Sequence, residues 1–526
     1  MKYIMRNSKL LLQSLLIFSM LLACSDKKNH YPFEIGEYGG WIAGDFHEHT
    51  FFTDGGYSMD SLFHRGFTMY GLSFMANSEH GGTSDQNFDG TYWQDIPNIT
   101  FKGLPVEKDG MKLMWRWQTL LEFSYPHLND QRSTYQNKHL LQGLEWNSPA
   151  TSHTSTGIIA DEGLPISSFE YMFDSSDLDT LGGPADHLHK HNGRDDHGHG
   201  DRLSDSMQTQ GTITAVKWLM DHFPETSYTI PAHPERGGRI SLEDLRNMNN
   251  AGPSVAFGIE AAPGHQKSER RGAYRSYSLG SDTYGGWGHM AAKIGGIWDA
   301  MLGEGRHFWV FANSDFHGTS SDFWPGEYQK NWVLVDDIRS QRSIIKGMRS
   351  GNVFVTHGDL IDSLQFFISD GKGVAATMGG TLHTASKGPF HVHIRFRSPE
   401  KNHNGDAPVV NTLQIITGEV TGYTAPGTEA YSIDHNETAT LAKVYTSADW
   451  ETDNGWNEIN HEIKNMESDF YVRIRGTNHL PGTPFETDTN GNPLADSLSL
   501  NLNLNGEAEA WADLWFYSNP IFLDLE

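Results

Sequence analysis

The chain contains a single cysteine, Cys24, among 526 residues, so no disulfide can form within it. Basic residues are also scarce, because 39 Lys and Arg stand against 66 Asp and Glu, a formal net charge of −27. Nucleic-acid polymers are bound through basic surfaces, so no nucleic-acid polymer binding is expected. Hydrophobic residues make up 37% of the chain and aromatic residues 12%, which excludes a wholly disordered protein.

An apolar run, Leu10 to Ala23, follows three basic residues at the start of the chain. It is too short to span a bilayer comfortably and has the layout of a secretory signal. It ends in Leu21-Leu22-Ala23-Cys24, which resembles the bacterial lipoprotein cleavage box. The sequence therefore predicts a signal peptide at residues 1–23 and lipidation of Cys24. The protein would then be exported and lipid-anchored to a bacterial cell-envelope membrane, periplasmic or at the cell surface. A plain signal peptide with an incidental cysteine is the alternative.

Residues 24–38 are predicted to form a polar tether, and residues 39–360 alternate between strand-like and helix-like segments. The expected strands are Trp41–Phe46, Leu72–Ala76, Tyr228–Ala232, Ser254–Ile259, Phe308–Ala312 and Val353–Thr356. The expected helices are Ser58–Met69, Thr212–His222, Leu242–Asn249, Ile294–Leu302 and Ser340–Ser350. This alternation favours a parallel α/β sheet or barrel. Two insertions interrupt it, an aromatic one near residues 81–138 and a polar, His-rich one near residues 167–210.

The pattern changes near Leu360, because residues 361–526 show period-2 strands separated by Gly, Asn, Pro and Asp turns. The expected strands are Leu364–Ile368, Phe390–Phe396, Thr412–Ile416, Phe470–Ile474 and Trp511–Tyr517. This spacing predicts an all-β sandwich domain.

Two histidines, His47 and His49, follow the first expected strand. Residues i and i+2 of a strand point to the same face, so both imidazoles can reach one metal ion. The pair His391 and His393 has the same spacing but lies within an expected strand of the β domain, without acidic or histidine partners in motif-like positions. The second pair is therefore interpreted as one face of a sheet.

Further acidic and histidine residues stand at or just beyond the carboxyl ends of expected strands. They are Asp54, His80, Glu145, His153, His233, Asp315 and His317. In α/β barrels the active site assembles at this edge. Nine such residues on one rim would crowd charge to no structural purpose unless cations neutralise it. The dominance of imidazoles favours Zn, Mn or Fe over Ca or Mg.

The ordered set His-x-His, Asp-Gly, Glu-His, Gly-x-Glu, His, Ala-His-Pro and Ser-Asp-x-His resembles the PHP (polymerase and histidinol phosphatase) family, over roughly residues 38–360. The resemblance implies a distorted (β/α)7 TIM-like barrel that holds two or three divalent metal ions and hydrolyses phosphoesters. Two departures stand out. Glu79 of Ser78-Glu79-His80 replaces the family's usual aspartate, and the gap between His80 and Glu145 is longer than usual.

Residue by residue, the resemblance implies three metal positions. The first would be held by His47, His49, Glu145 and Asp315; the second by Glu145, His153 and His233; the third by Asp54, His80 and His317. Glu79 is expected to orient His80. Arg236 is expected to reach a phosphate oxygen with its planar fork, with a salt bridge to Glu235 or another surface acid as the alternative.

The resulting hypothesis is a metallophosphoesterase that directs a metal-bound hydroxide at a small anionic phosphorylated substrate, either a monoester or a diester. Two alternatives stay open: hydrolysis of an amide or ester bond without phosphate, and a surface glycan-binding protein with a degenerate barrel. The oligomeric state is open. The His-rich stretch 186–199 is interpreted as a solvated loop, the aromatic insertion as a structural cover or a lid, and Asp488–Asn492 as a hairpin turn.

Overall fold

The computed structural model describes residues 31–184, 205–236, 240–272, 282–464 and 466–525. Contacts divide the chain into two units, Met1–Glu34 and Ile35–Glu526, and every described helix and strand belongs to the second. The predicted signal peptide, Cys24 and the His-rich stretch 186–199 lie outside the described residues. Among the described residues, no helix has both the length and the apolar character needed to cross a membrane.

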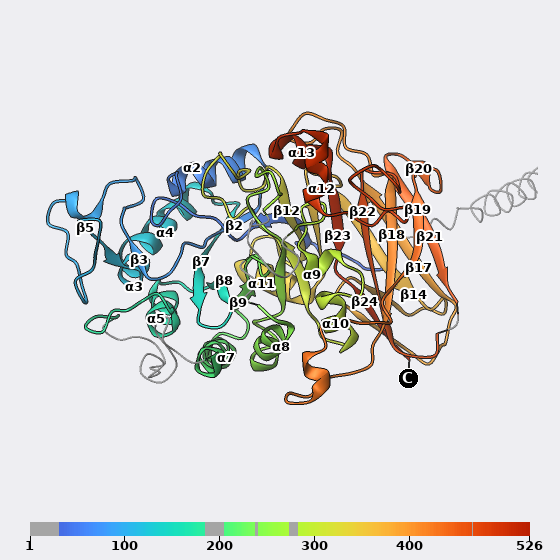
Figure 1. Cartoon of the computed structure of the whole chain (residues 1–526), viewed down its shortest axis with the longest axis horizontal. Coiled ribbons are helices and arrows are strands. Elements are labelled where there is room, and N and C mark those ends of the chain that lie inside the picture. The colour runs from blue at the N-terminus through green and yellow to red at the C-terminus, as the bar shows by residue number, and fades with distance from the viewer. Residues whose placement is uncertain (1–30, 185–204, 237–239, 273–281, 465, 526) are drawn as a thin grey trace, which may run out of the picture. The chain divides into compact units, whose positions relative to one another are not determined.

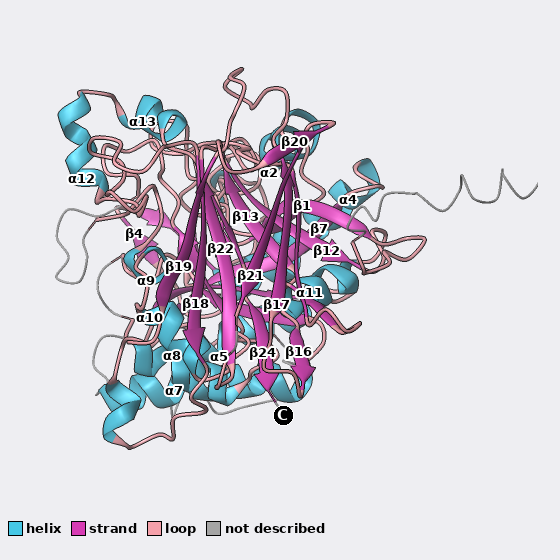
Figure 2. Ribbon diagram, turned by 90° about the vertical axis from the view of Figure 1, so that its right-hand side faces the viewer, coloured by secondary structure: helices cyan, strands magenta, loops and turns pink. Residues whose placement is uncertain are grey.

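The framework is a large mixed sheet with the strand order β9-β8-β7-β2-β1-β12-β13-β23-β22-β24-β16, in which β18 pairs with β22 and β19 pairs with β18. Figure 2 looks onto its C-terminal strands. The strands are β1 (Gly40–Asp45), β2 (Phe74–Asn77), β7 (His139–Ser148), β8 (Ser152–Ile158), β9 (Ser227–Pro231), β12 (Gln329–Val335), β13 (Val353–His357), β16 (Thr381–Thr384), β18 (Thr412–Glu419), β19 (Thr440–Thr446), β22 (Phe470–Thr477), β23 (Trp515–Ser518) and β24 (Ile521–Leu525).

Helices cover the first half of this sheet, and α5, α7 and α8 follow one another beside β7, β8 and β9 in Figure 1. The α-helices are α2 (Met59–His64), α3 (Arg116–Thr119), α4 (Tyr125–Thr134), α5 (Leu164–Phe173), α7 (Asp205–His222), α8 (Leu242–Ala251), α9 (His289–Ala292), α10 (Ile297–Gly303), α11 (Gln341–Ser350), α12 (Asp496–Ser499) and α13 (Gly506–Ala512). Helix α8 begins at a capping box, in which Ser241 and Asp244 each satisfy the other's backbone N–H.

Two further strands, β10 (Gly258–Ala262) and β11 (Trp309–Ala312), pair in parallel with each other. Strand β10 contacts β9, and β11 contacts β12. Thr229 N–H donates to the Val255 carbonyl (2.8 Å) on the β9 side. On the other side, the Asn331 amide bonds both the N–H and the carbonyl of Ala312. These contacts are individual hydrogen bonds and do not form strand ladders, so no closed barrel is detected within the described residues.

The expectation of a parallel sheet needs correction, because the sheet is mixed. Strand β8 is antiparallel to β7 and β9, and β12 is antiparallel to β1 and β13. Strand β12 is not predicted from the sequence because it opens with Gln329, Lys330 and Asn331, which obscure the apolar strand signal. The expected strand Trp511–Tyr517 is also wrong in its first half, since α13 runs to Ala512 and β23 begins at Trp515.

The aromatic insertion folds into short elements: β3 (Thr83–Ser84), β4 (Glu107–Lys108), β5 (Met111–Lys112), β6 (Met114–Trp115), α3 and α4. Trp93 and Met114 from this segment are buried in one apolar cluster with Met59 of α2 and Met75 of β2. The insertion is thus packed onto the sheet as a structural cover.

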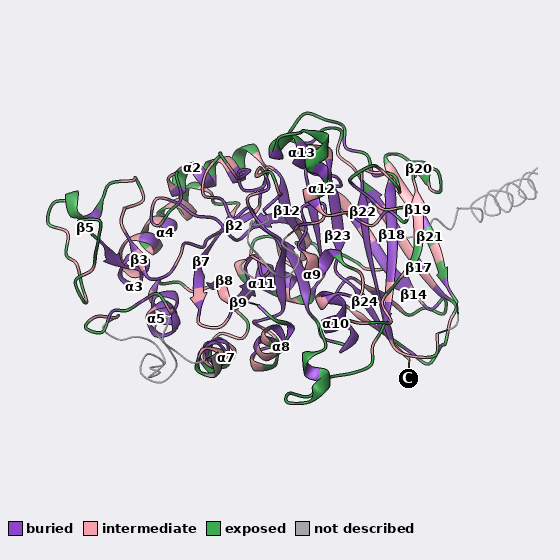
Figure 3. Ribbon diagram, viewed as in Figure 1, coloured by how far each residue is buried: buried purple, intermediate pink, exposed green. Residues whose placement is uncertain are grey.

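A separate antiparallel sheet has the order β15-β14-β17-β21-β20. Its strands are β14 (Ser363–Ser369), β15 (Ala375–Thr377), β17 (Phe390–Arg397), β20 (Glu451–Asp453) and β21 (Trp456–Ile463). Buried residues alternate along β17, which leaves His391 and His393 together on the opposite face, as expected. The buried face shares one apolar core with β18, β22 and β24, whereas β20 carries the exposed residues coloured green in Figure 3.

The two halves of the chain are joined by a fully buried ion pair between Asp299 of α10 and Arg473 of β22. The carboxylate accepts hydrogen bonds from Arg473 Nε (2.9 Å) and Nη2 (2.8 Å), from the Tyr471 hydroxyl (2.9 Å) and from Gly295 N–H (2.7 Å). The sheet also runs across position 360, because β13 pairs with β23. The predicted domain boundaries stay predictions.

Replacing Asp299 with alanine leaves Arg473 buried without its counter-charge. The free energy of unfolding is therefore expected to fall by about 3–5 kcal/mol, measured from urea unfolding curves. Lys387→Ala is the matched control, because Lys387 pairs with Glu467 on the surface and its loss should cost at most ~1 kcal/mol. Equal effects of the two changes would contradict the role given to the buried pair.

Candidate metal centre

Nine predicted ligands come from loops and strand ends at one edge of the sheet. His47 and His49 follow β1, His80 follows β2, His233 follows β9, and Asp315 with His317 follows β11. Glu145 lies on β7 and His153 at the start of the antiparallel β8. Strands β1, β2, β7 and β9 run in one direction, so their carboxyl ends meet at this edge.

The most buried part of the centre contains His47, His49, Glu145 and Asp315, each at most 1% exposed. His47 Nε2 lies 3.2 Å from Glu145 Oε1 and 3.3 Å from Asp315 Oδ1. His49 Nε2 lies 3.4 Å from Glu145 Oε2 and 3.3 Å from Asp315 Oδ1. The two Nε2 atoms are 3.2 Å apart.

These distances match the ligand spacing of a metal site. Four ligands placed tetrahedrally around a zinc-like ion at its usual bond lengths lie ~3.3 Å from one another. The five measured separations span 3.2–3.4 Å. Imidazole nitrogens and carboxylate oxygens are also the donor atoms that zinc-like ions take. The residues present therefore fit a divalent ion.

Glu145 also contacts the less buried histidines. His80 Nδ1 lies 2.7 Å from its Oε2, while His153 Nδ1 (2.8 Å) and His233 Nε2 (3.1 Å) approach its Oε1. Glu145 thus joins the predicted first and second metal positions, and His80 adds a contact to the second that the sequence did not suggest.

A further group surrounds Asp54, whose side chain is 56% exposed. Its two carboxylate oxygens lie 3.3 Å from His80 Nε2 and 3.4 Å from His317 Nε2. His49 Nδ1, 3.6 Å from Asp54, has no hydrogen-bond partner among the described residues. The third predicted set therefore also comes together, at the solvent-facing side of the centre.

Glu260 of β10 contacts the ring nitrogen of His47 that faces away from the cluster, and the sequence did not predict it. Its Oε2 accepts a hydrogen bond from His47 Nδ1 (2.9 Å), and its Oε1 accepts one from the Ser155 hydroxyl (2.5 Å). A proton on Nδ1 leaves the Nε2 lone pair of His47 pointing into the cluster, as a metal ligand requires. A charged residue inside the apolar run 259–262 was the signal that could have revealed it.

His265 and Asp322 are also part of the centre and were also missed. His265 Nε2 lies 3.6 Å from Asp315 Oδ2, and its Nδ1 hydrogen-bonds Asp322. Asp322 accepts hydrogen bonds from the backbone N–H groups of His317 (2.6 Å) and Gly318 (3.0 Å). Asp322 therefore fixes the loop that carries Asp315 and His317.

The two predicted catalytic residues have defined partners. Glu79 accepts hydrogen bonds from Thr50 N–H (3.1 Å), from the Thr50 hydroxyl and from the Thr53 hydroxyl (2.5 Å), so it holds the turn before Asp54. The sequence predicts that Glu79 orients His80. Arg236 donates from Nη1 to Asp315 Oδ2, which places a positive charge beside the cluster.

Three residues of the centre, His233, His265 and Asp315, adopt positive φ angles of 32°, 60° and 46°. Non-glycine residues rarely adopt this conformation, which costs of order 1–3 kcal/mol and concentrates at functional sites. The fold therefore accepts backbone strain to direct these three side chains inward.

The two buried carboxylates of the cluster are ionised. Burial by itself would raise the pKa of Glu145, but His153, His80 and His47 hold it well below its usual range. Burial opposes ionisation of Asp315 too, and His47 with Arg236 hold its pKa well below the usual range. Both carboxylates are thus available as ligands at neutral pH.

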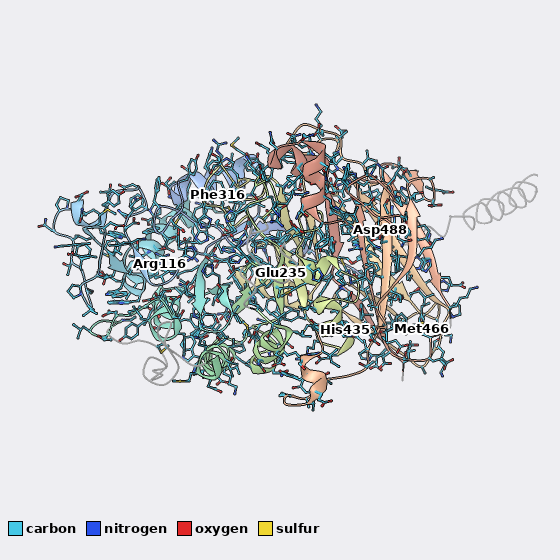
Figure 4. All side chains as sticks on the ribbon, viewed as in Figure 1. Arg116, Glu235, Phe316, His435, Met466 and Asp488 are labelled. Atoms are coloured by element: carbon cyan, nitrogen blue, oxygen red, sulfur yellow. The ribbon has the colours of Figure 1, made fainter. Side chains whose placement is uncertain are left out.

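A cavity of about 610 Å³ is lined by Pro234, Glu235 and Leu242 and, from the second half of the chain, by Asp434 and His435. Glu235 and His435 are labelled in Figure 4. The Glu235 carboxylate accepts a hydrogen bond from Met290 N–H. None of the nine predicted ligands lines this cavity, so it is separate from the metal centre.

No protein-family model matches the sequence, and no curated protein matches it either. One similar solved structure is a two-domain protein from Bacteroides vulgatus, described as containing a predicted PHP-like metal-dependent phosphoesterase. It aligns with 88% of this chain and 98% of its own, at 11% sequence identity and a TM-score of 0.35. That similarity is too low to assign this chain to a family.

The reconstituted protein is expected to hold about two to three equivalents of Zn, Mn or Fe at this centre, measured by elemental analysis. Asp315→Asn/His317→Ala removes one ligand from each of two groups and should release at least one equivalent. The control is His391→Ala/His393→Ala, which removes the other His-x-His pair and should release none. Less than one equivalent in the unmodified protein would contradict the centre.

Proposed function

We propose that this protein is a metal-dependent hydrolase of phosphoesters of the PHP type. The observation that carries the proposal is the close set of His47, His49, Glu145 and Asp315, with the Arg236 guanidinium beside it. Within this proposal, residues 39–360 correspond to a distorted (β/α)7 barrel, and residues 361–526 to an appended β domain.

The proposed metal positions use the nine predicted residues in three overlapping groups. His47, His49, Glu145 and Asp315 would hold the innermost ion. Glu145 would be shared with the ion held by His153 and His233, and Asp54, His80 and His317 would hold the outermost one. When bound, divalent ions supply polarisation of a phosphoryl oxygen and activation of a water molecule.

The chain's own residues prepare this chemistry. Glu260 keeps the His47 proton on Nδ1, and Asp322 fixes the loop of Asp315 and His317. Arg236 is part-buried and planar, and its fork matches two oxygens of a phosphoryl group. His80, His153 and His317 are 23–30% exposed, so the centre opens to solvent on their side. A small anionic phosphorylated substrate would approach from there.

The metal-loaded protein is expected to hydrolyse members of a panel of phosphomonoesters and phosphodiesters, with inhibition by inorganic phosphate. Arg236→Gln should lower kcat/KM roughly 10- to 100-fold, the cost of one hydrogen bond to a charged group, while Arg236→Lys retains part of the activity. Arg339→Gln, which removes an exposed arginine, is the control.

The metal content of each variant is measured beside its activity, because Arg236 contacts the ligand Asp315. A folded, metal-loaded protein that cleaves no phosphoester would overturn the proposal. Hydrolysis of amides or carboxylic esters without inhibition by phosphate would favour the non-phosphate alternative. Soluble glycan binding by a catalytically inert protein would favour the binding-protein alternative.

We also propose that the mature protein is exported and lipid-anchored through Cys24, on the basis of its sequence context alone. Cys24→Ser should then move the protein from the detergent-extracted membrane fraction to the soluble fraction. Ser25→Ala is the control and should stay with the membranes. Unchanged membrane association of Cys24→Ser would contradict the anchor.

A further inference from the structure

A second buried cluster of ionisable side chains lies in the C-terminal part of the chain. His479 follows β22, Glu486 belongs to the loop before α12, and Asp513 follows α13. His479 Nε2 lies 3.2 Å from Asp513 Oδ1 and 4.0 Å from Glu486 Oε2. The three ligand atoms all lie within 4.8 Å of one another, and none of these residues belongs to the first centre.

Glu509 of α13 provides an independent observation. Its side chain is 3% exposed, and neither carboxylate oxygen has a hydrogen-bond partner among the described residues. Glu509 stands four residues before Asp513, which follows the helix and donates its backbone N–H to the Glu509 carbonyl (3.0 Å). A buried carboxylate without hydrogen bonds is costly and therefore indicates a missing partner.

The cluster holds more negative than positive charge. Glu486, Asp496, Glu509 and Asp513 are each at most 6% exposed. Arg271 is the buried cation that faces them, with Nη1 2.9 Å from Asp513 Oδ2. Asp496 is satisfied separately by the backbone N–H groups of Gly285 (2.7 Å) and Gly286 (2.9 Å).

Two kinds of cation could balance the excess: a proton on Glu486 or a divalent ion among the carboxylates. The geometry suits the ion, because the 3.2 Å between His479 Nε2 and Asp513 Oδ1 is close to the ~3.3 Å between tetrahedral ligands, and Glu486 Oε2 lies 4.0 Å from the same nitrogen. Asp513 Oδ1 accepts one hydrogen bond, from Trp515 Nε1 (2.6 Å), and keeps a lone pair free for a second partner. The His479 side chain is 13% exposed, which gives an ion a path from solvent.

The neighbouring acidic turn does not belong to this cluster. Asp488, labelled in Figure 4, accepts hydrogen bonds from the N–H groups of Asn490 (2.8 Å) and Asn492 (2.9 Å) within its own turn. Its charge is thus satisfied locally, as the expected hairpin turn requires.

We propose that His479, Glu486 and Asp513 bind one divalent cation, whose charge also offsets the buried Glu509 carboxylate. An imidazole combined with carboxylates suits Zn²⁺ better than Ca²⁺, which takes oxygen ligands. The ion fastens the segment 479–513 to the Arg271 loop through Asp513, which makes it a structural site. This site does not depend on the proposed phosphoesterase activity.

The test measures Zn²⁺ content by elemental analysis after the full mature protein is dialysed against buffered Zn²⁺. Glu486→Gln should lose one equivalent, and His479→Gln should lose the same equivalent. Added to the Asp315→Asn/His317→Ala variant, Glu486→Gln should remove the same one equivalent, because the two centres share no residue. The matched control is His383→Gln/Asp524→Asn, an exposed histidine–carboxylate pair, which should lose nothing.

The thermal unfolding midpoint supplies the second readout. Zn²⁺ should raise it in the Asp315→Asn/His317→Ala background, and this rise should become smaller when Glu486→Gln is added. If Glu486 is simply protonated, glutamine mimics it, and both metal content and the Zn²⁺-dependent rise stay unchanged; that result overturns the proposal. If Glu486→Gln does not fold, His479→Gln and Glu509→Gln decide the question by the same measurements.

Discussion

Glu145 is the side chain on which the metal centre depends, because five imidazoles approach its two oxygens within 3.4 Å. A carboxylate has four lone-pair positions, so this arrangement exceeds what ordinary hydrogen bonds can satisfy. Glu145 lies opposite Ser155 in the register of β7 and β8, and its N–H donates to the carbonyls of Ser78 (3.0 Å) and Glu79 (2.9 Å). A shift of that register by one residue would turn its side chain to the other face of the sheet. The long strand β7 therefore fixes the position of the Glu145 carboxylate, which the five imidazoles approach.

Several of the chain's many acidic side chains are buried inside the fold. Asp299 connects α10 to β22, Glu260 orients His47, and Asp322 holds the loop after β11. Each of these carboxylates is buried and fully engaged by hydrogen bonds or ion pairs, as buried charge must be. An excess of acid over base is thus compatible with a stable core where backbone N–H groups and imidazoles supply the missing donors.

Much of the centre could be predicted from the sequence because a simple rule of sheets applies to it. Residues that follow parallel strands meet at one edge, so short motifs after apolar runs, such as His47-Glu48-His49, identify the site. Glu260 was not predicted because it lies within the strand, where the pattern shows an apolar run with one charged residue. His265 was not predicted because the direction of its side chain into the centre depends on a φ of 60°, which no residue spacing encodes. His479, Glu486 and Asp513 meet through tertiary packing of three separate segments.

The two clusters share one arrangement of charge. In the first, Arg236 bonds Oδ2 of Asp315 and leaves Oδ1 facing two imidazoles at 3.3 Å. In the second, Arg271 bonds Oδ2 of Asp513 and leaves Oδ1 facing His479 at 3.2 Å. In each case burial opposes ionisation of the aspartate, yet its pKa lies below the usual range, with the arginine among the causes. An arginine on one oxygen thus keeps the carboxylate charged and fixes its rotation, so the other oxygen is presented as a ligand in a direction that a solvated aspartate would not hold.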